Sequence, residues 1–161
     1  MAMRLLPLMV LLSMLFYVPA LFANCGLVVE RAMNFGLYNV AQKNPLHSVL
    51  FLKVTCAQGN VGHYKIALSR GKGRSYTPRR MRGEQGAIYY NLYLDPARSV
   101  VWGNGRRGTV LVEGNGPCTD LKPCRHVIYG KVTGSSNKLS AEHYVDTIRA
   151  VLFYDEISNP Q

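Results

Sequence analysis

The most reactive side chains in the sequence belong to four cysteines, Cys25, Cys56, Cys118 and Cys124. None of them has the Cys-x-x-Cys spacing of many zinc sites. Four cysteines allow three disulfide connectivities. Because Cys118 and Cys124 enclose only "TDLKP", we expect them to pair locally, which leaves Cys25 and Cys56 for a second bridge. A zinc site that joins Cys124 to His126 is the alternative, and an oxidising compartment favours the disulfide.

Other residue types that support catalysis are present without a catalytic pattern. The four histidines show no metal-ligand spacing and are His47, His63, His126 and His143. "GKGRS" lacks the Gly-Lys-Ser/Thr ending of a phosphate-binding loop, and no serine lies in a Gly-x-Ser-x-Gly context. We therefore expect no enzyme activity, no cofactor and no metal site.

The first residues have the pattern of a secretory signal peptide. One positive charge, Arg4, precedes an almost wholly apolar run over residues 5–18, and small residues offer cleavage points after Ala20 or Ala23. A membrane anchor is the alternative, but the run is short for a bilayer span. The sequence predicts a signal peptide over residues 1–23.

The remaining residues, 24–161, have the size of one domain with its own core. Loss of Arg4 changes the net charge from +10 to +9. An exported basic protein meets anionic lipids and polysaccharides, although a solvated basic face that aids solubility explains the charge equally well. Basic residues near aromatics are typical of nucleic-acid binders, but export argues against that partner; they are Arg79, Arg80, Arg82, Arg106 and Arg107.

Apolar residues alternate with polar ones in short runs that Gly, Pro and Asn separate, which predicts an all-β sandwich. The expected strands cover residues 46–56, 63–69, 88–95, 109–114, 126–132 and 144–156. The last of these is the longest and is apolar on both faces near its end. The basic, Gly-rich stretch 69–86 is expected to be a connection.

The segment from Asn91 to Gly105 holds two strand ends and a turn. Asp95 and Pro96 fit the first two positions of a type I turn, and "SVVW" continues as another strand. Asp95 and Arg98 are expected to form an ion pair across the turn. We interpret Trp102, the only tryptophan, as a core residue.

These residues together resemble the spore coat protein U domain family, which includes subunits of archaic chaperone–usher pili. The matching motifs follow one another in order and span the chain after the signal peptide: "NFGLYN", "VTC", "YKIALSRGKG", "PRRM", "IYYNLYLDPARSVVWGNG", "VIYGKV" and "YVDTIRAVLFY". The resemblance also supports the Cys25–Cys56 bridge.

The resemblance implies an immunoglobulin-like sandwich that lacks its last strand. The gap would leave an apolar groove, which a periplasmic chaperone fills first and a strand from a neighbouring subunit fills in the fibre; an outer-membrane usher would be a further partner. Chaperone–pilin donor-strand complementation is an established form of strand addition. The residues expected to line the groove are Leu27, Val29, Ile148, Ala150, Leu152 and Tyr154.

Two features depart from the fibre-forming pattern. Family members that polymerise carry an apolar extension before the first cysteine, whereas here Cys25 follows the predicted cleavage point closely. "DEISNPQ" also continues beyond the usual end near Tyr154. We therefore predict an exported structural subunit that accepts a strand but donates none, at a pilus tip or end, and that serves surface attachment and biofilm formation. The alternative is a free-standing secreted coat protein that recognises anionic surface polymers.

Overall fold

The computed structural model describes residues 24–41, 44–57, 61–136 and 139–156, and all the regular elements in these ranges are strands. The strands are β1 (Cys25–Arg31), β2 (His47–Cys56), β3 (Val61–Leu68), β4 (Arg79–Arg82), β5 (Ala87–Tyr93), β6 (Val112–Asn115), β7 (Cys124–Ser135) and β8 (Ala150–Glu156). The expected all-β class is confirmed. The predicted signal peptide lies outside the described residues.

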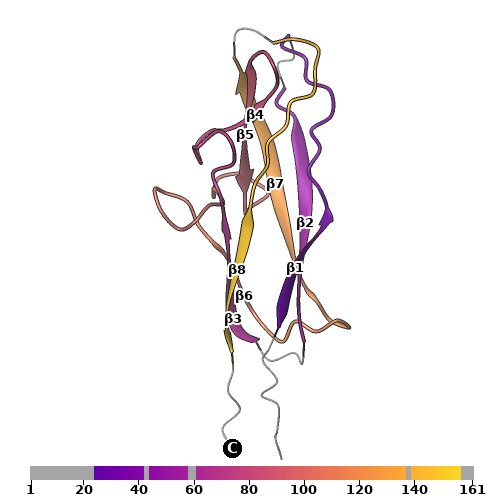
Figure 1. Cartoon of the computed structure of the whole chain (residues 1–161), viewed down its shortest axis with the longest axis vertical. Coiled ribbons are helices and arrows are strands. Elements are labelled where there is room, and N and C mark those ends of the chain that lie inside the picture. The colour runs from indigo at the N-terminus through magenta and orange to yellow at the C-terminus, as the bar shows by residue number, and fades with distance from the viewer. Residues whose placement is uncertain (1–23, 42–43, 58–60, 137–138, 157–161) are drawn as a thin grey trace, which may run out of the picture.

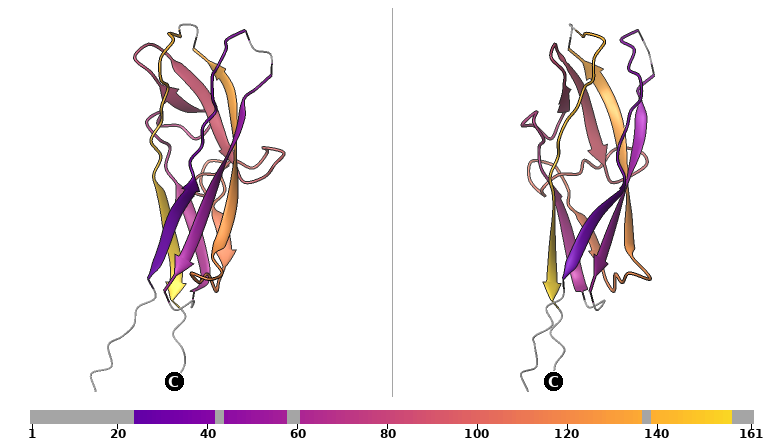
Figure 2. Two further views of the ribbon diagram at one scale, coloured as in Figure 1. Left: turned by 90° about the vertical axis from the view of Figure 1, so that its right-hand side faces the viewer. Right: turned by 45° about the vertical axis from the view of Figure 1, so that its right-hand side comes forward.

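The strands form two antiparallel sheets that face each other (Figures 1 and 2). The larger sheet has the order β1-β2-β7-β5-β4, and the smaller has the order β6-β3-β8. In immunoglobulin notation, β1-β2-β7-β5 correspond to strands A-B-E-D, and β3-β8 correspond to C-F. Strand G would pair with the other edge of β8, and no described residue occupies that place. The fold is an immunoglobulin-like sandwich without its last strand.

Alternation places one face of each strand in the core. Leu52, Val54 and Cys56 of β2 and Tyr64, Ile66 and Leu68 of β3 are all buried, as their spacing predicts. Across the core, the Tyr64 hydroxyl lies 2.7 Å from Nε2 of His126. Trp102 is fully buried, and its Nε1 donates a hydrogen bond to the Ile66 carbonyl at 2.9 Å.

Both expected disulfides are present. Cys25–Cys56 joins the start of β1 to the end of β2, and Cys118–Cys124 closes the loop before β7. The two bridges are neighbours, since the Cys56 amide donates to the Cys118 carbonyl at 2.7 Å. They stabilise the end of the sandwich where β1 approaches β8.

The expected strand over residues 144–156 is wrong in its first half. β8 begins only at Ala150. Before it, Val145 exchanges two backbone hydrogen bonds with Arg82 of β4, at 2.9 and 3.1 Å. The chain therefore runs along the larger sheet before it crosses to the smaller one, which an alternating pattern alone does not reveal.

The segment between β3 and β6 also differs from expectation. The basic stretch 69–86 contains β4, and "SVVW" forms only isolated bridges, Tyr93 with Val101 and Trp102 with Val110. β4 pairs with β5 only as far as Tyr90. Beyond that point the larger sheet continues through hydrogen bonds from Leu94 to Val100 and from Trp102 to Leu92, both 2.9 Å.

The expected ion pair between Asp95 and Arg98 is absent. The Asp95 carboxylate instead accepts hydrogen bonds from the amides of Ser99 and Val100, at 2.9 and 2.7 Å. These bonds, that of Val100 above all, lower the pKa of Asp95. Arg98 donates to two carbonyl oxygens, those of Pro96 and Gly130. The turn satisfies its polar groups through the backbone rather than through paired charges.

Candidate binding groove between the sheets

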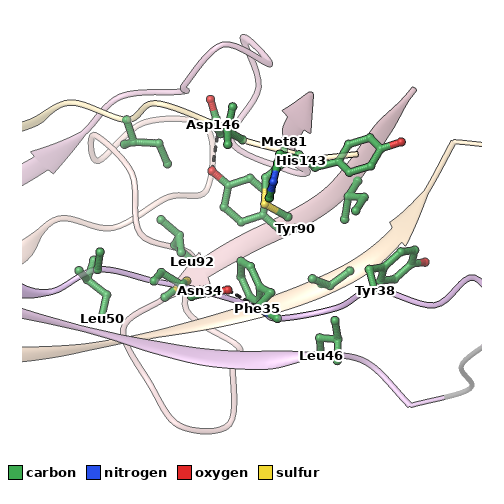
Figure 3. Close-up of a pocket in the computed structure, with 18 of the residues that line it drawn as sticks. Asn34, Phe35, Tyr38, Leu46, Leu50, Met81, Tyr90, Leu92, His143 and Asp146 are labelled. Atoms are coloured by element: carbon green, nitrogen blue, oxygen red, sulfur yellow. Dashed lines mark hydrogen bonds between the residues drawn. The ribbon is translucent and has the colours of Figure 1, made fainter. Parts of the chain in front are cut away.

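An open groove of about 1210 Å³ lies between the two sheets. One border is the chain that follows β1, residues 32–40, which we call the N-terminal rim. The other is the chain that precedes and enters β8, residues 139–150, which we call the C-terminal rim. Figure 3 shows side chains from both rims and from the sheets turned into the space between them.

The floor of the groove is apolar. It is built from the inward side chains of both sheets and from the tryptophan between them: Leu46, Leu50, Leu52, Leu68, Met81, Ile88, Leu92, Trp102 and Val132. Large apolar concavities that rigid strands hold open are typical of binding sites for apolar partners. The groove can therefore take an extended segment with alternating apolar side chains.

Backbone groups on both sides of the groove are available to such a segment. Within the described ranges, β1 pairs only with β2, and β8 pairs only with β3. Each strand thus presents one edge of N–H and C=O groups toward the gap, and an unpaired edge is a template for a further strand. The apolar floor and the hydrogen-bonding edges therefore adjoin, since Val29 of β1 and Ala150 of β8 line the groove and the rest of both strands continues beyond it.

The N-terminal rim rests on the floor mainly through apolar contacts. The Phe35 ring meets the Tyr90 ring edge-on, with centroids 5.8 Å apart. Met33 and Phe35 lie over Gly130 of β7 so closely that a Cβ at this position would collide with both. Farther along, Leu37 and Val40 are 95% and 68% exposed.

The C-terminal rim is held by hydrogen bonds to the loop between β4 and β5. The Glu142 carboxylate accepts from the amides of Glu84 and Gln85, at 2.6 and 2.9 Å. A hydrogen bond from the Ser140 hydroxyl and then the Gln85 amide lower the pKa of Glu142 to about 2. The Tyr144 hydroxyl donates to the Gln85 carbonyl at 2.9 Å.

One polar contact lies inside the groove. The Tyr90 hydroxyl donates to the Asp146 carboxylate at 2.7 Å, as the dashed line in Figure 3 marks, and the Lys72 amide donates to the same carboxylate at 2.8 Å. Burial raises the pKa of Tyr90, and the bond to Asp146 adds to the rise. Tyr90 is therefore a neutral donor that fixes the C-terminal rim to β5.

The structure divides the six residues expected to line the groove into two sets. Val29, Ile148 and Ala150 line the cavity. Leu27, Leu152 and Tyr154 are half-buried and pack on the core outside it. The sequence reasoning did not assign a groove role to Met33, Phe35, Tyr38, Leu139 or Tyr144, which also line the cavity or its rims. The alternation of Met33 with Phe35 just after β1 is the signal that would have found two of them.

One of the five arginines expected at a basic surface, Arg79, lies in the core. Arg79 is fully buried and donates hydrogen bonds to the Asn91 side chain and to the Trp102 carbonyl, both at 2.8 Å. Burial lowers the pKa of its guanidinium. Arg79 connects the start of β4 to Asn91 and Trp102, while Arg80, Arg82, Arg106 and Arg107 remain exposed.

The described residues show no arrangement for metal chemistry and no membrane-spanning helix. Within these ranges, His, Cys, Asp and Glu do not gather in groups of three or more that could hold a metal ion. None of these ranges forms a helix with the length and hydrophobicity that a membrane crossing requires. The groove is a feature of the described fold that suits an apolar partner.

The fold and the groove define a class: immunoglobulin-like domains in which the place of the last strand is open. A comparison with protein families gives the membership. The model of the Spore Coat Protein U domain matches residues 11–151, and the chain belongs to this family.

Solved structures contain the same fold. The chain is similar to a chain in the crystal structure of the CsuC–CsuE chaperone–tip adhesion subunit pre-assembly complex, from the archaic chaperone–usher Csu pili of Acinetobacter baumannii. The two are 16% identical with a TM-score of 0.52, over 81% of this chain and 40% of that one. No curated protein matches the chain.

Proposed function

We propose that this protein is an exported structural subunit of a chaperone–usher pilus. The observation that carries the proposal is the apolar groove between the sheets, whose two rims continue into the unpaired edges of β1 and β8. A domain gains stability when a further strand covers such a floor. The strand removes apolar surface from water and forms hydrogen bonds with the free backbone groups. Family membership supports the same role.

The proposed partners follow from the order in which the groove is filled. A periplasmic chaperone supplies the first strand, an outer-membrane usher exchanges it, and a neighbouring subunit supplies the final strand. The solved complex to which this chain is similar pairs a chaperone with a tip adhesion subunit, which supports the first of these partners. The protein would pass through the periplasm to the cell surface.

We further propose a position at the tip or end of the fibre, with a role in surface attachment and biofilm formation. Cleavage after Ala23 would leave only Asn24 before β1. Such a mature chain accepts a strand and has none to donate. Mass spectrometry of the exported protein would locate the cleavage site, and self-polymerisation of the purified protein would contradict the position.

Strand addition tests the main proposal directly. Synthetic peptides with alternating apolar residues, taken from subunits encoded beside this protein, would be added to the exported protein. We expect a matching peptide to raise the melting temperature by about 10 °C or more. A peptide whose apolar positions are shifted by one residue is the control, because the shift turns its apolar face to solvent.

Two substitutions in one strand sharpen the test. Ala150→Arg places a charge in the groove, and Val151→Arg places the same charge on the exposed face of β8. The first variant should lose the peptide-induced shift and the second should keep it. Equal behaviour of the two variants, or no effect of any peptide, would overturn the strand-accepting role.

A further inference from the structure

The outer face of the larger sheet is the side that points away from the core and the groove. Its side chains alternate along each strand with buried ones. We define the outer face by the half-exposed or exposed residues His47, Val49, Phe51, Arg80, Tyr89, Tyr93, Val127, Tyr129 and Lys131. Aromatic and cationic side chains dominate it, which is unusual for a surface that only needs to be soluble.

The aromatic rings lie next to one another across the strands. Tyr93 of β5 and Tyr129 of β7 are direct register partners, so their side chains are neighbours on the same face. Tyr89 lies near the start of β5, and its register partner is Arg80 of β4. Tyr93 and Tyr129 thus form an aromatic pair across β5 and β7, and Tyr89 with Arg80 lies farther along the same face.

Cationic groups cover these rings. The guanidinium of Arg98 lies over the Tyr129 ring, 5.8 Å from its centroid, and that of Arg80 lies over the Tyr89 ring at 5.5 Å. Lys131 of β7 lies between these two pairs. Its register partners are His47 of β2 and Asn91 of β5. The Arg80 guanidinium is held by its ring contact, and that of Arg98 is held also by hydrogen bonds from Nε and Nη1 to the Gly130 and Pro96 carbonyls, which leaves its Nη2 for a ligand.

The positive charge here is not neutralised within the described residues. Neither Arg80, Arg98 nor Lys131 forms an ion pair there. The nearby Asp95 carboxylate is engaged by its own loop. Partial burial and then the charges of Arg98 and Lys131 lower the pKa of His47, so both cations disfavour a third positive charge beside them. A ligand with several negative charges would relieve this repulsion.

We propose that the outer face binds an acidic polysaccharide. The tyrosine rings offer flat apolar surfaces for the C–H faces of sugar rings. Arg80, Arg98 and Lys131 offer donors for carboxylates carried along the same polymer, and guanidinium groups suit carboxylates because they bind them with two parallel hydrogen bonds. A neutral glycan would leave the cations unpaired, and a simple anion would leave the rings unused.

The outer face and the groove are independent sites. Within β7, Val132 faces the groove while Lys131 faces outward, so the two sites lie on opposite sides of one sheet. A strand in the groove would not cover the outer face. The inference therefore goes beyond the pilus role and stands even if that role fails.

Binding of polygalacturonate to the exported protein tests the proposal, with neutral dextran and single-stranded DNA as comparison polymers. We expect salt-sensitive binding of polygalacturonate and none of dextran. Arg80→Gln with Lys131→Gln should weaken binding by about tenfold. Arg106→Gln with Arg107→Gln is the matched control, because it also removes two charges, both exposed, from the loop before Thr109, and should change the affinity by less than about twofold.

A second pair of variants separates ring stacking from charge. Tyr93→Ala should weaken binding of polygalacturonate without a change in net charge, whereas Phe153→Ala, at an exposed position on the smaller sheet, should not. Thermal melting checks that each variant is folded. The proposal is overturned if the Arg106 and Arg107 variant weakens binding as much as the Arg80 and Lys131 variant, if Tyr93→Ala has no effect, if DNA binds more tightly than polygalacturonate, or if no binding occurs.

Discussion

The two rims of the groove are held in different ways. The C-terminal rim is tied to β4 and β5 by hydrogen bonds of the Glu142 and Asp146 carboxylates and by the backbone pair of Val145 with Arg82. The N-terminal rim makes few such bonds, among them one from the Asn34 amide to the Ser48 hydroxyl at 3.3 Å. It relies on Met33 and Phe35 packed against the floor.

This difference has a mechanical consequence. Hydrogen bonds are directional and fix a backbone in one position, whereas apolar contacts allow side chains to shift with little loss. A strand that enters the groove as proposed would meet one fixed border and one adaptable border. The fixed C-terminal rim would set its register, and the N-terminal rim would adjust to the size of its side chains.

The largest expected effect concerns the anchor of β1, from which the N-terminal rim continues. Replacing Cys25 and Cys56 together by serine should lower the free energy of unfolding by about 4 kcal/mol, and replacing Cys118 and Cys124 by about 2, because the first bridge closes the longer loop. Chemical denaturation of the two double variants measures both. A larger loss for the shorter loop would show that β1 needs no covalent anchor.

The next effect concerns the fixed rim. Asp146→Ala leaves the buried Tyr90 hydroxyl without its acceptor and should reduce stability by about 2 kcal/mol. Asp146→Asn retains an acceptor oxygen and should cost less than half as much. Denaturation of the two variants tests this, and equal losses would mean that the hydrogen bonds do not hold the C-terminal rim.

A smaller effect is expected at the adaptable rim. In Gly130→Ala, the new Cβ meets only the ends of the flexible Met33 and Phe35 side chains, so the loss should stay below about 1 kcal/mol. In the control Gly103→Ala, the Cβ meets the buried Thr109 side chain, including its own Cβ. Thermal melting should rank the control as clearly less stable; the reverse order would show a rigid N-terminal rim.

The smallest effect is the pH dependence from Glu142. Its pKa in the folded protein, about 2, lies below the ordinary value of 4.5. The stabilisation is therefore fully present above pH 4.5 and is lost as the pH falls toward 2. Glu142→Gln should melt at a lower temperature than the unchanged protein at pH 6, and the difference should shrink at pH 2.5. A difference in melting temperature that does not change with pH would show that ionisation of Glu142 does not contribute to stability.

Local patterns predicted much of this fold. The alternation in β2, β3 and β5 placed Leu52, Ile66 and Leu92 in the core, because period-two patterning and burial on one face are the same property. The disulfides followed from the even number of cysteines and one short spacing. The start of β8 was missed, since extended chain looks alike whether it pairs with one sheet or crosses between two.

The groove was harder to predict than the strands. Val29, Ile148 and Ala150 were placed beside it from the family resemblance, but Leu152 and Tyr154 follow the same alternation and lie outside the cavity. Alternation identifies which face of a strand is apolar. It does not say how far along the strand the opposing sheet stays in contact.

The amino-acid sequence by itself determined the all-β class, the buried faces of β2, β3 and β5 and the cysteines available for bridges, because these depend on neighbours within a few positions. Only the tertiary structure decided that Arg79 is buried, that residues 139–149 cross between sheets, and that tyrosines and cations from β4, β5 and β7 share one surface. These features depend on contacts between residues far apart in the chain, and such contacts exist only once the sheets have formed.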